Sequence, residues 1–156
     1  MKTACARLIM RRERRAPPIR LRTSVLVLFA AAFACRAPKR DYDVAQIAQV
    51  TNVKELMRVQ ATVADPRFKL AAKMRGKPLG DAEFAEFLDM GTRLEATAKR
   101  LGSFSEGRPG FDKYAADLGK QAADLGRAAR AKNGPDTTST ALAMKKTCAA
   151  CHGEFR

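Results

Sequence analysis

The apolar residues of this chain recur at steps of three and four along four stretches of about 20 residues, and this spacing restricts the fold more than any other feature. Such a period places the apolar side chains on one face of an α-helix. Gly, Pro and Asn residues separate the stretches, and no alternating pattern typical of a strand competes with them. Four amphipathic helices joined by short loops predict an all-α protein, an antiparallel up-down-up-down four-helix bundle. The stretches cover residues 43–64, 82–101, 111–131 and the segment after Asp136.

The residues that flank these stretches predict where the helices begin and end. Pro66 is expected to interrupt the first helix, because the residue before a proline disfavours the helical conformation, and residues 67–75 are expected to resume as a short basic helix. Asp81 is a candidate N-cap of the second helix, and Asp136 of the fourth. Met90 lies among charged residues and is assigned to a polar face of the second helix. The residues expected to face the core from the first helix are Val44, Ile47, Val50, Val53, Met57 and Ala61.

Residues 1–34 have the features of a signal peptide for export. They contain eight Lys and Arg residues against a single Glu, and they end with an apolar run from Val25 to Ala34. This run is too short for a transmembrane helix, which needs ~20 residues, and it suits the core of a signal peptide. Its last three residues have the small-x-small pattern of a cleavage site. An anchor that is never cleaved is the alternative interpretation.

Cys35 directly follows the cleavage pattern, and two outcomes agree with the sequence. Ordinary cleavage before Cys35 would release the protein into the periplasm, whereas lipidation of Cys35 would attach it to a membrane. Residues 35–40 then form a linker, and one domain spans residues 41–156. Half of the formal net charge of +14 lies outside the signal peptide, which suits an acidic protein partner or an anionic membrane surface. No basic face with interleaved aromatic residues is found, so a nucleic-acid partner is not expected.

The chemistry of the chain is concentrated in Cys148-Ala149-Ala150-Cys151-His152, which has the spacing of a c-type haem attachment signal. Two Cys residues three positions apart lie on one face of a helix, so both thiols can reach the vinyl groups on one edge of a haem. His152 is the only His of the chain and is expected to be the proximal ligand of the iron. A structural zinc site would need four ligands, and a redox dithiol would need a βαβ context; the sequence offers neither. The motif therefore predicts one covalent haem c, bound through thioethers of Cys148 and Cys151.

An exported four-helix bundle with this motif near its C-terminal end resembles the class II c-type cytochromes, a family that comprises cytochrome c-prime and its low-spin relatives. The resemblance covers residues 41–156 and is clearest from Thr147 to Arg156, where an aromatic and a basic residue follow the His. The segment Val53–Met57 resembles the first helix of the low-spin members. In those relatives the Met that matches Met57 is the second axial ligand of the iron. In cytochrome c-prime that side of the iron is empty and binds small gases. The family often forms dimers, so a homodimer is one expected assembly. A monomer is the other, because repulsion would oppose the contact among the basic residues Lys54, Arg58, Arg67, Lys69 and Lys73.

The other Met residues of the mature chain are poorer candidates for a second ligand. Met144 lies on the helix of His152, Met90 on a polar face and Met74 in a basic, loop-like stretch. With Met57 bound, the resemblance implies a periplasmic electron carrier that serves redox protein partners. Without it, the resemblance implies a five-coordinate protein that binds gases such as NO or CO, and Met57 is only a pocket wall. Enzymatic activity is not expected, because acid–base catalysis on the distal face usually uses a His or a carboxylate, and no second His exists.

Overall fold

The structure of the chain is a computed structural model, and it describes residues 41–105 and 107–155. The predicted signal peptide, and Cys35 with its linker, lie outside the described residues. Within the described part the chain forms five helices and no strand. The helices are α2 (Val44–Ala48), α3 (Val53–Met74), α4 (Asp81–Gly102), α5 (Phe111–Arg130) and α6 (Gly134–Phe155).

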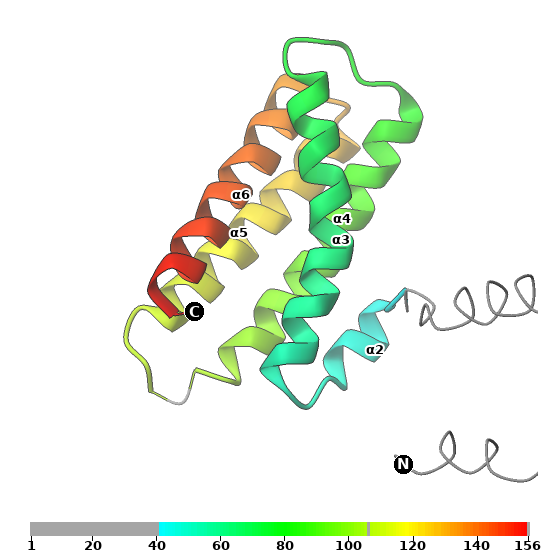
Figure 1. Ribbon diagram of the computed structural model, residues 1–156. Coiled ribbons are helices and arrows are strands. Elements are labelled where there is room, and N and C mark those ends of the chain that lie inside the picture. The colour runs from blue at the N-terminus through cyan, green and yellow to red at the C-terminus, as the bar shows by residue number, and fades with distance from the viewer. Residues whose placement is uncertain (1–40, 106, 156) are drawn as a thin grey trace, which may run out of the picture. The chain divides into compact units, whose positions relative to one another are not determined.

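The four long helices of the described chain, α3 to α6, run alternately up and down and pack side by side (Figure 1). Each contacts the next along the chain, and α6 returns to contact α3. The contact between α4 and α5 is the most extensive, whereas α3 touches its two neighbours more sparingly. The predicted all-α, antiparallel four-helix bundle is therefore confirmed. None of the helices in the described residues is both long enough and apolar enough to cross a membrane.

The first predicted helix begins correctly at Asp43, the N-cap of α2, but it is wrong in its middle and at its C-terminal end. A break at residues 49–52 separates α2 from α3, and Asn52 begins α3 by accepting a hydrogen bond from the backbone N–H of Glu55 at 2.8 Å. The helix then continues through Pro66, whose ring is exposed. Proline removes one helical hydrogen bond, but Phe68 and Ala71 beyond it are buried in the core. Burial of this apolar face maintains the helix, because tertiary packing supplies most of a helix's stability.

Two helix caps also differ from those expected from the sequence. The N–H of Gly80 donates to the Glu83 carboxylate at 3.0 Å, so Gly80 is the N-cap of α4 and Asp81 is its first residue. The side-chain oxygen of Asn133 accepts a hydrogen bond from the N–H of Asp136 at 3.2 Å. Asn133 therefore caps α6, and Asp136 lies inside its first turn.

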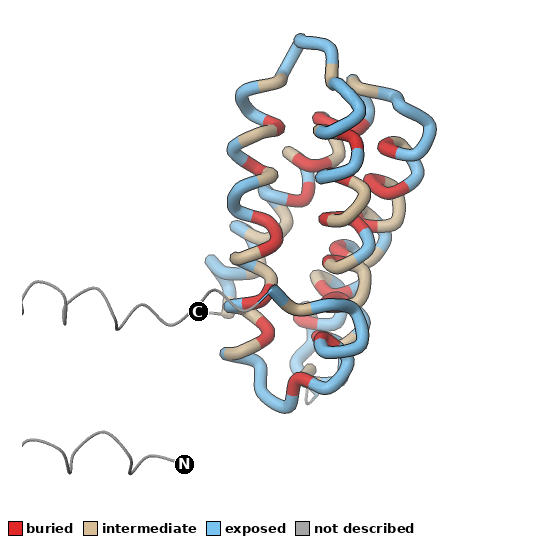
Figure 2. The backbone as a smooth tube through the Cα atoms, turned by 90° about the vertical axis from the view of Figure 1, so that its right-hand side faces the viewer, coloured by how far each residue is buried: buried red, intermediate tan, exposed pale blue. Residues whose placement is uncertain are grey.

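The buried residues lie on the inner sides of the helices (Figure 2). The buried apolar ones form two clusters. The main core connects all four long helices and includes Phe68 of α3, Phe87 and Leu94 of α4, Leu125 of α5 and Met144 of α6. The second cluster lies where α3 begins and α4 ends. Its buried members are Ile47, Val50, Leu56, Val59, Leu101, Phe111 and Ala115.

Met90 belongs to the main core and is fully buried, which contradicts its assignment to a polar face. The charged residues around it point to the edge between α3 and α4. There Asp89 pairs with Arg67 at 3.3 Å and with Arg93 at 2.8 Å. The charged side chains therefore occupy the edge of α4 that faces α3, and the adjacent Met90 side chain faces the core.

The close contact between α4 and α5 depends on Gly91. A Cβ atom at this position would lie 2.8 Å from the carbonyl oxygen of Ala122 and 3.0 Å from the backbone nitrogen of Gly126. Backbone atoms cannot move aside as a flexible side chain can. The crossing of the two helices therefore requires a residue without a side chain at Gly91.

Candidate functional site

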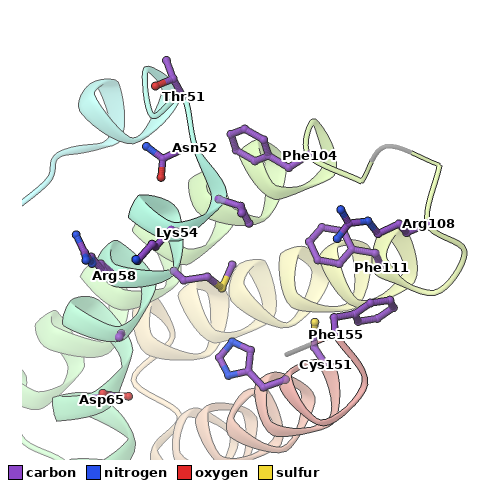
Figure 3. A pocket seen from close by; sticks show the side chains of 14 residues that line it. Thr51, Asn52, Lys54, Arg58, Asp65, Phe104, Arg108, Phe111, Cys151 and Phe155 are labelled. Atoms are coloured by element: carbon purple, nitrogen blue, oxygen red, sulfur yellow. The ribbon is translucent and has the colours of Figure 1, made fainter.

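A cavity of about 990 Å³ opens between the first half of α3 and the last turns of α6. It lies at the end of the bundle that contains the second cluster, because Phe111 and Phe155 belong to both. Figure 3 shows Lys54 and Arg58 on the α3 wall, Cys151 and Phe155 on the α6 wall, and Phe111 at the start of α5. The lining residues are Thr51, Asn52, Val53, Lys54, Met57, Arg58, Ala61, Asp65, Phe104, Arg108, Phe111, Cys151, His152 and Phe155.

The α3 wall of the cavity is an apolar stripe formed by Val53, Met57 and Ala61. The sequence assigned these residues to the core, and this expectation is wrong. The neighbouring stripe, which contains Leu56 and Val59, is buried instead. Val53 remains 43% exposed, so α3 presents a second apolar face that no other helix covers. Met57 is half-buried at the edge of the second cluster.

The α6 wall is formed by Cys151, His152 and Phe155. The buried residues of α6 end at Met144, so its last turns pack only partly against the bundle. Phe155 closes the end of the cavity, with its ring edge-on to that of Phe111 at a centroid distance of 5.4 Å. His152 is exposed and half-buried Cys151 lies beside it, so both side chains are accessible from the cavity.

The structure thus brings Met57, Cys151 and His152 to one cavity, but it does not place Cys148 in the lining. Cys148 is half-buried and packs against the main core. Its thiol nevertheless interacts electrostatically with Asp65 and Cys151, which both line the cavity. The first Cys of the motif therefore lies beside the cavity, one helical turn before the second.

Both thiols are held in their neutral form. Burial raises the pKa of Cys148 to about 11, and the nearby Cys151 and Asp65 add to the shift. Burial also raises the pKa of Cys151, with a further contribution from Glu154. A catalytic dithiol needs the opposite, a thiol whose pKa is lowered so that the thiolate can attack. The surroundings therefore argue against thiol–disulfide chemistry at these two residues.

The polar residues of the cavity carry mainly positive charge. Lys54 and Arg58 lie on exposed positions of α3, Arg108 on the loop before α5, and Asp65 at the opposite end of the α3 stripe. Such a rim favours a ligand that is largely apolar but carries acidic groups on one side.

Sequence reasoning missed the loop residues Phe104 and Arg108. They lie between α4 and α5, outside any periodic stripe, and only the packing of the bundle brings them to the cavity. An aromatic residue in a segment rich in Gly is the one local signal that could have marked Phe104, because apolar loop residues usually pack against something.

The cavity places a thioether sulfur of α3 opposite an imidazole and a thiol of α6. Thioether and imidazole are the donors that hold haem iron in many cytochromes. Nowhere in the described residues, this cavity included, do three His, Cys, Asp or Glu side chains come together as a metal site. No family model, no curated protein and no solved structure matches this chain.

Proposed function

We propose that this chain is an exported mono-haem c-type cytochrome related to class II, and that it carries electrons between periplasmic redox proteins. The observation that carries the proposal is the shared cavity of Met57, Cys151 and His152, reached from two different helices. Its volume of about 990 Å³ is at the upper end of the range of ligand pockets, ≈ 300–1,000 Å³. Its apolar stripe and soft donors suit a haem. A bound haem would supply a one-electron redox centre.

Each residue of the site has a distinct role in this proposal. Cys148 and Cys151 would hold the haem c covalently through thioethers, and His152 would be the proximal ligand. Met57 would be the distal ligand, which fills the second axial position and raises the reduction potential. Lys54 and Arg58 would offset the negative charge of the propionates. The protein would have no enzymatic activity, because a saturated iron has no position for a substrate.

One observation favours a second candidate, a five-coordinate protein of the cytochrome c-prime kind that binds NO or CO. Met57 packs partly against the second cluster, so its side chain already has an apolar environment. A Met that is needed only for packing would leave the distal side of the iron free. In that case Met57, Val53 and Ala61 would form the wall of a gas-binding pocket.

The location and assembly that accompany this function are also proposals. Residues 1–34 would direct export, and Cys35 would either be the first mature residue or carry a lipid that attaches the protein to a membrane. The resemblance to class II cytochromes adds a homodimer as one of the two expected assemblies, beside a monomer.

The decisive experiment is an optical spectrum of the mature protein from a host that attaches haem, recorded oxidised, reduced and with CO. We expect a low-spin spectrum with the Met–iron charge-transfer band and little change with CO. A high-spin spectrum that shifts with CO would support the gas-binding candidate instead. A protein without any haem signal would overturn both.

Met57→Ala tests the distal ligand directly. We expect the charge-transfer band to disappear and the reduced protein to bind CO, because one axial position becomes free. Met74→Ala is the matched control, since Met74 ends α3 and lies outside the cavity lining. A Met57→Ala spectrum identical to that of the parent would remove Met57 from the iron.

A further inference from the structure

We propose that residues 41–50 form a strap that holds the first turns of α3 and thereby positions Met57 at the cavity. This role of the strap in ligation rests on the proposed function above. The strap comprises α2 with the residues on either side of it, and it contacts α4 as well as the start of α3.

The first turns of α3 need such support because their other side faces the cavity. Val53, Lys54, Met57 and Arg58 all line the cavity, so no helix packs against that side of α3. Support for these turns therefore has to come from the side of α2 and α4.

Part of that support is a buried apolar cluster that the first turns of α3 share with the strap. Leu56 and Val59 are the buried residues of the first turns of α3, and both belong to the second cluster. The strap contributes Ile47, which is fully buried, and Val50, which is 4% exposed. Leu101 of α4 completes this contact. The strap, the first turns of α3 and the end of α4 thus contribute to one buried cluster at the cavity end.

Polar contacts fix both ends of the strap to α4. At the N-terminal end, the Arg93 guanidinium pairs with the Asp41 carboxylate and donates a hydrogen bond to the carbonyl oxygen of Tyr42 at 3.2 Å. At the other end, Nε of Arg100 donates to the carbonyl oxygen of Val50 at 2.7 Å. The strap is therefore fastened to a helix that belongs to the main core.

A single side-chain hydrogen bond then connects the strap to α3. The Tyr42 hydroxyl donates to Oε1 of Glu55 at 2.7 Å. Glu55 lies two residues before Met57, in the first turn of α3. Tyr42 is therefore a positioning residue: it does not line the cavity, but it restrains the first turn of α3, directly before Met57.

Tyr42→Phe in the mature haem protein tests this role, because it removes the hydroxyl and keeps the ring. We expect amide hydrogen exchange in the first turns of α3 to become about fivefold faster, the effect of losing one typical hydrogen bond. We also expect CO to bind the reduced protein about fivefold faster, since Met57 would leave its position more often. Tyr114→Phe is the matched control. Tyr114 is the other Tyr of the chain, and its hydroxyl bonds to Glu154 of α6.

The outcomes separate the strap from the proposed function. Unchanged α3 exchange in Tyr42→Phe, or an equal change in Tyr114→Phe, would overturn the strap. Faster α3 exchange with an unchanged rate of CO binding would show that the strap holds α3 and would overturn its role in positioning Met57. A parent protein without haem, or a haem spectrum that Met57→Ala leaves unchanged, would instead overturn the proposed function. The exchange experiment would still decide whether the strap holds α3.

Discussion

The carboxylate of Asp41 lies against the guanidinium of Arg93, which also binds Asp89 at 2.8 Å. The hydrogen bond from Arg93 and its positive charge lower the pKa of Asp41 below the usual value of 3.8. A carboxylate with a lowered pKa stabilises the folded state at pH values above 3.8, and this contribution is lost as the pH falls through the lowered pKa. Asp41 is exposed, so the effect is small and is screened by salt.

Asp41→Asn should therefore lower the melting temperature slightly near neutral pH. The difference from the parent should disappear in acid, once the parent carboxylate is protonated as well. Thermal unfolding followed by circular dichroism across this pH range measures both effects. Asp117→Asn, which removes an exposed carboxylate from the middle of α5, is the control. A difference that persisted unchanged into acid would mean that Asp41 acts through something other than its charge.

The site residues show what a sequence reveals at the scale of single residues. The placement of Cys148, Cys151 and His152 on one helix could be predicted because their spacing is local. The position of Met57 at the cavity could not be derived from the periodicity. Two adjacent stripes of α3 are apolar, and only the packing of α2 and α4 decides which of them is buried.

Among the described helices, α4 and α5 contact each other most extensively, and Gly91 lies where their backbones approach closely. Gly91→Ala should cost a net 1–2 kcal/mol of unfolding free energy, roughly, because overpacking outweighs the gain in helix propensity. Gly119→Ala makes the same change where the new Cβ would lie 3.5 Å from the Ala98 side chain, an ordinary contact. This control should be neutral or should gain up to ~1 kcal/mol. Chemical denaturation measures both variants. Equal stability of the two would contradict the close crossing.

The helices that the sequence predicted well are those with one clear stripe and strong breakers at both ends. For α4 and α5 the predicted bounds agree with the structure to within one residue. The first predicted helix failed because Pro66 looks like a breaker, whereas the break at residues 49–52 contains no Gly or Pro. Local rules cannot weigh the burial of Phe68 and Ala71 against one lost hydrogen bond, since that burial depends on other helices.

At the scale of the whole molecule, the main core and the second cluster predict that two parts of the bundle differ in local stability. Amides of α4 and α5 that lie in the main core should exchange most slowly, at a rate set by global unfolding. Amides of α2 and of the first turns of α3 depend on the smaller second cluster and should exchange faster through local opening. Hydrogen exchange followed by mass spectrometry resolves these segments. Equal protection along α3 and α5 would show that the bundle opens as one unit.

The separation of the cavity from the main core also affects how such a protein can evolve. Val53, Lys54, Met57, Arg58 and Ala61 line the cavity, and none of them belongs to the main core. Substitutions at these positions change the lining of the cavity with little effect on the buried volume of the main core that keeps the bundle folded. Natural or directed selection can therefore vary the chemistry at one end of the molecule while the stability provided by the other end tolerates the variation.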